Sequence, residues 1–221
     1  MAVKTSEARH RDAFETSVKI TGWFYDMHRP EVAMTDPHKV IDVLNEAKVS
    51  FVLVGTHGLV GYRSESRATH DVDVVATKKD LAKAQAALEE AFPDLKVVDL
   101  PAVVRFIEEP SNKGVIDLIK PASKLFRTVF RNTEQVGKSH RIPSLEMVLV
   151  LKWFAMTAEN RAYARKLQDG GDFADIVAEQ GDVIDEPKVR RIGNGIEPGA
   201  GTKIVAAIRD VRTGKELRIV P

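Results

Sequence analysis

Three short apolar segments, two of them interrupted by a carboxylate, constrain the fold of this chain more than any other feature. Residues 51–54 form a continuous apolar run that ends at a glycine, as is typical of a strand buried on both faces. Residues 71–75 read Asp-Val-Asp-Val-Val, and residues 115–119 read Val-Ile-Asp-Leu-Ile. These segments predict neighbouring strands of one sheet, with acidic side chains on at least two of them.

The carboxylates of Asp71 and Asp73 are two residues apart. Successive side chains of a strand point to opposite faces, so these two carboxylates project to the same side. Two like charges on one face repel each other unless a cation joins them. The glycine turn at Gly55 and Thr56 precedes this strand and could hold phosphate. The pattern predicts a magnesium and nucleotide site.

Asp117 is an isolated carboxylate in an apolar strand. Burial of an ionised group is costly without a partner, which could be a hydrogen bond, a cation or a metal ion. If this strand neighbours that of Asp71 and Asp73, three carboxylates meet. Such a set, without His or Cys, suits Mg²⁺ or Mn²⁺, and two metal ions can clamp a phosphoryl transfer. A structural role as a satisfied core acid is the alternative.

The remaining pattern predicts an α+β fold. Residues 6–28 are expected to form a polar helix, and Asp36 with Pro37 marks the start of the next. Residues 77–80 resemble a capping box before a helix that ends near Pro93. Residues 103–108 and 114–119 are predicted to pair as an antiparallel hairpin because their connection is short. A helix is also expected within residues 121–130.

The second half is expected to be helical. Ser144 is the predicted N-cap of a long helix that reaches about residue 167, and Gly170 with Gly171 is expected to break it. A shorter helix follows and ends near Gly181. Residues 204–208 and 217–220 are predicted to form a hairpin. The predicted domains are an N-terminal helical extension (1–35), a core with a small mixed β-sheet flanked by helices (36–142), a helical subdomain (143–181) and a tail (182–221).

Composition limits the class of protein. The chain has 221 residues, 43% of them hydrophobic, which is enough for a substantial core. No apolar run approaches the roughly 20 residues that span a bilayer, the polar start does not resemble a secretory signal, and there is no cysteine. A cytoplasmic protein is therefore expected. The stretch 120–141 carries six Lys or Arg and one Glu; it is either a solvated face or a surface for nucleic acid.

Four motifs in the same order resemble the nucleotidyltransferase superfamily that includes DNA polymerase β. They are the glycine turn at 55–56, Arg-Ala-Thr-His-Asp-Val-Asp at 67–73, Val-Ile-Asp-Leu at 115–118, and Lys-Trp-Phe-Ala at 152–155 followed by Asp-Phe-Ala-Asp-Ile at 172–176. The branch of AbiEii-like bacterial toxins and related uncharacterised proteins is the most similar. Thr56 departs from the Ser or Gly that the superfamily usually has there.

The resemblance implies a nucleotidyltransferase core that moves a nucleoside monophosphate from an NTP, such as ATP, to an acceptor hydroxyl. It implies that Asp71, Asp73 and Asp117 hold Mg²⁺ or Mn²⁺ and act as catalytic residues. Gly55 and Thr56 would bind the nucleotide. Arg67 would either hold phosphate or anchor the entry to the strand.

Lys152 lies in a stripe of apolar residues on its predicted helix, so it either extends to solvent or meets an anion. The resemblance implies the second, contact with the triphosphate as a catalytic and nucleotide-binding residue. Asp172 and Asp175 are second-tier candidates that would support the site, and Asp172 is also a candidate helix cap.

Several alternatives stay open. The acceptor is RNA such as tRNA, a protein or a small molecule, and the enzyme is of a toxin type or of another kind. A non-catalytic nucleotide-binding regulator, or an antitoxin-like partner protein, is the alternative to an enzyme. A cognate partner protein or a homo-oligomer is compatible with either, and no membrane association is expected.

Overall fold

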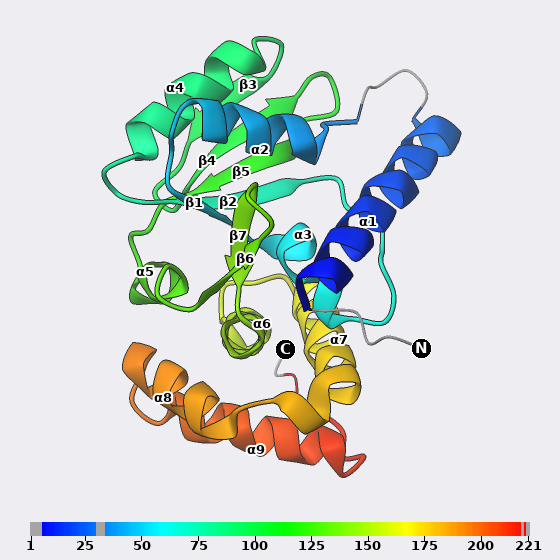
Figure 1. Ribbon diagram of the computed structural model, residues 1–221, viewed down its shortest axis with the longest axis vertical. Coiled ribbons are helices and arrows are strands. Elements are labelled where there is room, and N and C mark those ends of the chain that lie inside the picture. The colour runs from blue at the N-terminus through cyan, green and yellow to red at the C-terminus, as the bar shows by residue number, and fades with distance from the viewer. Residues whose placement is uncertain (1–5, 30–33, 218, 220–221) are drawn as a thin grey trace. The chain divides into compact units, whose positions relative to one another are not determined.

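The computed structural model describes residues 6–29, 34–217 and 219. The chain divides into two compact units (Figure 1). Unit 1 comprises Met1–Gly61 and Glu65–Ile142, and unit 2 comprises Tyr62–Ser64 and Pro143–Pro221. Unit 1 holds the β-sheets and unit 2 is helical, so the predicted α+β class is confirmed.

Unit 1 is built around a five-stranded mixed sheet with the strand order β1-β2-β5-β4-β3. β2 and β5 are parallel, and the other neighbouring pairs are antiparallel. The strands are β1 (Phe51–Leu53), β2 (Val72–Ala76), β3 (Lys96–Asp99), β4 (Val103–Glu108) and β5 (Lys113–Ile119). The antiparallel pairing of β4 with β5 confirms the predicted hairpin, whereas β3 was not predicted.

The two faces of this sheet differ in character. Val74, Leu118 and Val104 occupy neighbouring register positions on one face and are completely buried. Because side chains alternate along a strand, the next row of the same three strands points to the opposite face. That row consists of Asp73, Asp117 and Arg105. One face of the sheet therefore belongs to the core, and the other carries charge.

Helices α2 (Pro37–Glu46) and α4 (Leu81–Ala91) pack against each other and lie across the sheet (Figure 1). The predicted start of α2 is confirmed: the Asp36 side chain accepts a hydrogen bond from the His38 backbone N–H, and proline occupies the first turn. The predicted capping box before α4 is wrong. Asp80 is the N-cap, and the Thr77 hydroxyl donates instead to the Asp80 carboxylate.

Helix α1 (Ser6–His28) coincides with the predicted polar helix. Its buried residues recur every three or four positions, which defines one face of a helix, and they are His10, Phe14, Ser17, Thr21 and Tyr25. Most of these residues are polar, and the helix therefore has little hydrophobic contrast between its faces. Its packing partners in unit 1 include α3 (Gly55–Leu59) and β6 (Thr133–Val136).

The rest of unit 1 is small. The 3-10 turn η1 (Val60–Tyr62) follows α3, so residues 57–62 are helical. Helix α5 (Lys124–Val129) lies within the predicted range 121–130, and Ser123 is its N-cap. β6 pairs with β7 (His140–Pro143) in a two-stranded sheet that was not predicted.

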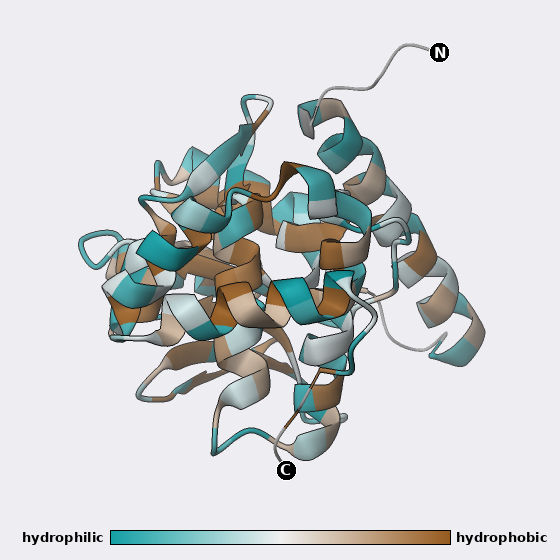
Figure 2. Ribbon diagram, turned by 90° about the horizontal axis from the view of Figure 1, so that it is seen from below, coloured by the Kyte–Doolittle hydropathy of each residue, from teal (hydrophilic) through white to brown (hydrophobic). Residues whose placement is uncertain are grey.

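Unit 2 consists of α6 (Leu145–Thr157), α7 (Tyr163–Gln180), the 3-10 turn η2 (Gly181–Val183), α8 (Glu186–Ile196) and α9 (Ala200–Arg212). Brown and teal segments alternate along the helices in Figure 2, as expected where one side of each helix is buried. Among the described helices of the chain, none is both long and apolar enough to cross a membrane.

Three helical predictions in unit 2 are wrong. The helix that starts after Ser144 ends at Thr157, and α7 begins only at Tyr163. Gly170 and Gly171 lie inside α7 and do not break it. A Cβ at Gly170 would overlap the side chain of Ile219, so this glycine allows close packing within a continuous helix. Asp172 is consequently a mid-helix residue and not a cap.

The predicted tail hairpin is also wrong. Residues 204–208 lie in α9, where Ile204, Val205 and Ile208 are buried at helical spacing. In the other predicted strand, Leu217 and Ile219 are described and belong to no strand, while Arg218 and Val220 lie outside the described residues. The short spacing of buried residues in 204–208 suits a helix face as well as a strand, and the helix forms because α9 packs on α8 and α7.

Candidate functional site

The parallel pairing of β2 with β5 places the predicted acidic residues side by side. Asp73 and Asp117 are register partners, so their side chains leave the same face of the sheet. Asp71 directly precedes β2, two positions from Asp73, and its charge acts on Arg105 as do the charges of Asp73 and Asp117. All three are partly exposed. The sheet therefore gathers three carboxylates on a single accessible face.

The predicted glycine turn lies directly against these acids. The backbone N–H of Val54 donates to the carbonyl of Asp73, at 2.9 Å, and Gly55 has a positive φ of 60°. A Cβ at Gly55 would overlap the Asp73 carboxylate and would stand 2.8 Å from its Cγ. Glycine is required here both for the left-handed conformation and for the close approach of backbone and carboxylate.

Arg67 and Thr56 meet at the start of α3. The Arg67 guanidinium donates to the Thr56 hydroxyl at 3.3 Å, and the backbone carbonyl of Arg67 accepts from the hydroxyl of Ser17 on α1. These contacts show how Arg67 is anchored. Its phosphate contact stays a prediction.

Asp71 is oriented by the segment before β2. The Thr69 hydroxyl donates to the Asp71 carboxylate at 2.7 Å. The backbone N–H of Thr69 donates in turn to the Thr21 hydroxyl at 3.2 Å. A side chain of α1 thus reaches the acidic strand through one intervening residue, so α1 takes part in positioning the site.

Arg105 is a site residue that the sequence reasoning missed. Its guanidinium donates to both oxygens of Asp117, from Nε at 2.8 Å and from a terminal nitrogen at 2.6 Å. Arg105 is the antiparallel register partner of Asp117. The hydrogen bond to Asp117 raises the pKa of Arg105, and the charges of Asp117, Asp73 and Asp71 raise it further, against an opposing effect of burial.

The donor chemistry of this face fits a divalent cation. Carboxylate oxygens without His or Cys are what Mg²⁺ and Mn²⁺ prefer. In the described part of the chain, however, no three His or acidic side chains already stand as a metal-binding cluster, and both oxygens of Asp117 are engaged by Arg105. The carboxylates of Asp71 and Asp73 suit a divalent cation as ligands. Asp117 suits it as well if Arg105 releases its carboxylate.

Lys152 lies on α6 in unit 2, where it contacts acidic residues of α7. Its ammonium group donates to Asp169 at 2.8 Å and to Asp172 at 2.6 Å. The Lys152 side chain is largely buried and retains 12% exposure. Lys152 therefore meets anions, as one of the two sequence alternatives expected, and these anions are two carboxylates of its own unit. Contact of Lys152 with a triphosphate stays a prediction.

Asp172 and Asp175 both pair with Arg63, a residue that the sequence patterns did not single out. Arg63 donates to Asp172 at 2.8 Å and to Asp175 at 2.7 Å, and Arg161 lies 2.6 Å from Asp169. Three cations and three carboxylates thus alternate in one network within unit 2. Arg63 lies far from α7 in the sequence and in no predicted motif, so no local pattern marked it.

Three histidines lie against the ring of Phe14 in unit 1, and a fourth lies one helical turn before Phe14 on α1. The rings of His38, His57 and His140 lie 5.0–5.6 Å from that of Phe14, and His10 is buried on the same helix as Phe14. Burial is the main cause that lowers the pKa of His57 and of His140, each to about 4. These side chains are therefore neutral at physiological pH.

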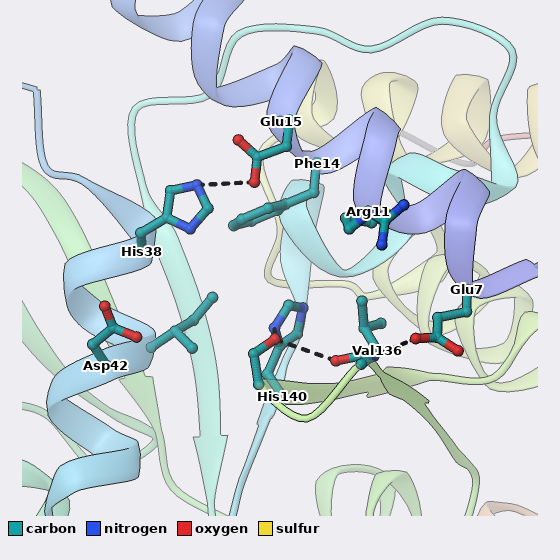
Figure 3. A pocket seen from close by; sticks show the side chains of 11 residues that line it. Glu7, Arg11, Phe14, Glu15, His38, Asp42, Val136 and His140 are labelled. Carbon is teal, nitrogen blue, oxygen red and sulfur yellow. Dashed lines mark hydrogen bonds and ion pairs between the residues drawn. The ribbon is translucent and has the colours of Figure 1, made fainter.

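A cavity of about 200 Å³ opens beside this cluster, between α1, α2 and the β6–β7 turn (Figure 3). His38 lies 3.2 Å from the Glu15 carboxylate, and the Ser139 hydroxyl lies 2.7 Å from Nδ1 of His140. The residues that line the cavity include three acidic residues and one arginine: Glu7, Glu15, Asp42 and Arg11. No sequence motif predicted this cavity, because its walls come from separate parts of the chain.

No protein-family model matches this sequence, and no curated protein matches it. Solved structures do match. A nucleotidyltransferase-like antigenic protein from Paracoccidioides brasiliensis is 14% identical, with a TM-score of 0.45 over 89% of this chain and 93% of that one. The antibiotic-resistance factor ANT(2'')-Ia is 12% identical, with a TM-score of 0.48 over 80% and 95%.

Terminal uridylyl transferase 4 from Trypanosoma brucei, with bound GTP, is 14% identical, with a TM-score of 0.31 over 75% of this chain and 56% of that one. The first neighbour is described as nucleotidyltransferase-like, the second as an antibiotic-resistance factor and the third as a terminal uridylyl transferase. At such low TM-scores, a functional assignment has to rest on the residues of the chain itself.

Proposed function

We propose that this chain is a nucleotidyltransferase that moves a nucleoside monophosphate from an NTP to an acceptor hydroxyl. The observation that carries the proposal is the row of acids on one face: Asp73 beside Asp117 in register, with Asp71 on the same side. The turn at Gly55 lies against this row. Acids and a close backbone turn are the parts that phosphoryl transfer requires, since its catalysis is mainly positioning and charge neutralisation.

Mg²⁺ or Mn²⁺, held by Asp71 and Asp73 and, after release of Arg105, by Asp117, would neutralise phosphate charge in the bound NTP. The turn at Gly55 and Thr56 would receive the phosphates. Arg67 beside Thr56 adds a positive charge near that turn. Lys152 is assigned to the triphosphate by the sequence motif, and it would have to share or release its pairs with Asp169 and Asp172.

The proposed reaction is an in-line displacement at the α-phosphorus. The acceptor hydroxyl gives its proton to Asp117 as its oxygen bonds to the α-phosphorus. The bond from that phosphorus to the bridging oxygen breaks, and pyrophosphate leaves with the electron pair. A carboxylate can accept this proton only if it is not fully engaged by a cation, so release of Asp117 from Arg105 belongs to the same proposal.

A direct test is transfer of α-phosphate label from each NTP, with Mg²⁺ or Mn²⁺, to total cellular RNA, to protein and to small alcohols. We expect label in one acceptor class and release of pyrophosphate.

Asp73→Asn is expected to reduce transfer by at least about 100-fold, by analogy with the removal of one element of electrostatic stabilisation, and to leave the fold intact by circular dichroism. Asp99→Asn is the matched control, since Asp99 is exposed at the edge of the same sheet. Equal transfer by the Asp73→Asn protein would contradict the proposal.

RNA is the acceptor that we favour. The exposed Lys and Arg residues of the basic stretch are Lys124, Arg127, Arg131 and Lys138, and exposed cations attract phosphate backbones. Label in protein or in a small alcohol would instead identify one of the other acceptors. A toxin-type role would appear as growth arrest on expression of the wild-type chain, absent with Asp73→Asn.

One observation favours a second candidate, a non-catalytic nucleotide-binding regulator or antitoxin-like partner. Both oxygens of Asp117 are held by Arg105, as they would be in a site that binds a nucleotide without reacting. Binding of ATP with Mg²⁺, measured by calorimetry, without pyrophosphate release for any acceptor, would favour this candidate.

A further inference from the structure

Arg105 and Asp117 form a salt bridge on the acidic face. It is a two-point pair between a guanidinium and a carboxylate, with distances of 2.8 and 2.6 Å, the geometry that gives such pairs their strength. The Asp117 side chain is only 15% exposed, so the pair is partly shielded from water. A pair of this kind uses a lone pair on each oxygen of Asp117 and places a positive charge beside the carboxylate that a metal ion would have to approach.

The sheet is built to let Arg105 reach Asp117. β4 has an irregular register between Phe106 and Ile107, directly after Arg105. A Cβ at Gly114 on β5 would lie 2.9 Å from Cδ and 3.0 Å from Nε of Arg105, closer than ordinary van der Waals contact. The missing side chain at Gly114 thus leaves the space in which the arginine lies.

The charge of Arg105 acts on more than one carboxylate. Asp71 and Asp73 as well as Asp117 interact with it electrostatically. Three carboxylates on one face repel one another, and a single guanidinium lowers that repulsion. A divalent cation at the same face would meet the same carboxylates, and it would be repelled by Arg105. The two cations therefore compete.

We propose that Arg105 is the resident counter-cation of the acidic face, which holds Asp117 until a divalent ion displaces it. Arg105 is then a positioning residue that acts through Asp117 and sets the affinity of the face for metal. The inference rests on the proposed function, because it takes Asp71, Asp73 and Asp117 as the metal-binding residues. It adds a competition that the acids alone do not have: a metal ion binds Asp117 against the positive charge of Arg105 until the arginine is displaced.

The test is Mn²⁺ binding to the full chain, measured by electron paramagnetic resonance without nucleotide, together with thermal unfolding with and without Mn²⁺. Arg105→Gln is expected to bind Mn²⁺ about tenfold more tightly than the wild type, the factor that corresponds to the lower end of a charged hydrogen bond. Its unfolding temperature should fall without metal and recover with Mn²⁺, since a ligand that binds the folded state stabilises it.

Two further variants keep the test valid if the Arg105→Gln protein does not fold. Gly114→Ala keeps the charge but crowds Arg105, and it should raise Mn²⁺ affinity in the same direction. Arg105→Lys keeps the charge without the two-point geometry and should fall between wild type and Arg105→Gln. Lys120→Gln is the matched control, because Lys120 pairs with Asp99 on the same sheet. It should leave Mn²⁺ affinity unchanged.

The outcomes separate this inference from the proposed function. If the wild type and all variants bind Mn²⁺ equally, with binding lost in Asp73→Asn, Arg105 is merely structural: the inference is overturned and the proposed function stands. If neither the wild type nor any variant binds Mn²⁺ and none transfers nucleotide, both are overturned. Tighter binding in Arg105→Gln and Gly114→Ala, and not in Lys120→Gln, supports the inference.

Discussion

At the scale of single residues, the site depends on the fit of Gly55 beneath Asp73. Gly55 combines a φ of 60° with a carboxylate placed where a side chain would begin. The first feature disfavours every residue with a Cβ, and the second adds a steric overlap. The sequence showed only a glycine before an acidic strand, so the turn was predictable, whereas its contact with Asp73 required the pairing of β1 with β2.

Gly55→Ala is therefore expected to destabilise unit 1 by about 2 kcal/mol or more, of which the left-handed conformation accounts for roughly 1–2 kcal/mol. The measurement is the midpoint of urea unfolding, monitored by circular dichroism. Gly22→Ala is the matched control. A Cβ at Gly22, within α1, meets nothing within 4 Å, so this change should be neutral or stabilising by up to about 1 kcal/mol. Equal midpoints for wild type and Gly55→Ala would contradict the account.

The pair of Arg105 with Asp117 shows what register adds to sequence. The hairpin of residues 103–108 and 114–119 was predicted, and pairing across its short turn places Arg105 opposite Asp117. A register assignment would have identified the partner that Asp117 needs. From the sequence alone, Asp117 needs a partner for its buried charge, and a hydrogen bond, a cation and a metal ion are equally compatible with its position.

At the scale of elements, α1 is more than a peripheral helix. Its buried stripe is mostly polar, so a hydrophobic pattern gave no sign of how it packs. Hydrogen bonds replace apolar contacts: Ser17 donates to the carbonyl of Arg67, and Thr21 accepts from the backbone of Thr69. The helix thereby fixes the segment that leads into Asp71 and Asp73.

Thr21→Val is expected to destabilise this segment by about 1 kcal/mol, the usual net value of a hydrogen bond, because the partly buried N–H of Thr69 loses its acceptor while the shape of the side chain is kept. Hydrogen exchange at the amide of Thr69 should accelerate. Thr16→Val serves as the control: Thr16 is exposed and its hydroxyl bonds only to Asp12 of the same helix. An unchanged exchange rate at Thr69 in the Thr21→Val protein would show that α1 does not hold the segment.

The helical half shows why local signals misled. Consecutive glycines usually end a helix, yet α7 continues through Gly170, where the Ile219 side chain takes the space that a Cβ would need. A helix end near Ala158 carried no such signal, and the continuous apolar pattern predicted one long helix. In both places a tertiary contact or a loop outweighed the local sequence. The sheet strands with a strong apolar run were predicted. The short strands were not: β3 and β6 are partly exposed, and β7 is mostly buried but only four residues long.

At the scale of the whole molecule, histidine burial predicts how stability depends on pH. The folded-state pKa of His57 and of His140 is about 4, below the value of about 6.5 in an unfolded chain. Between these values the unfolded state binds protons that the folded state does not. Stability is therefore lost as the pH falls from about 6.5 to 4, by up to about 3 kcal/mol for each histidine.

The measurement is the urea midpoint of unit 1 between pH 7.5 and pH 4, followed by near-ultraviolet and far-ultraviolet circular dichroism. His140→Asn is expected to reduce the decline, since one of the two buried histidines is gone. His28→Gln is the control, because His28 is exposed and its removal should leave the decline as it is. A midpoint that does not move across this range would contradict the burial of these imidazoles in neutral form.

The central claim is that Asp71, Asp73 and Asp117 form a face that binds a divalent cation together with the phosphates of an NTP. A crystal grown with Mn²⁺ and a non-hydrolysable NTP tests it most directly, through the anomalous signal of the metal. The account predicts Mn²⁺ at roughly 2.0–2.3 Å from carboxylate oxygens of Asp71 and Asp73, with phosphate over Gly55. Metal and nucleotide bound elsewhere, with these carboxylates uncoordinated, would contradict it.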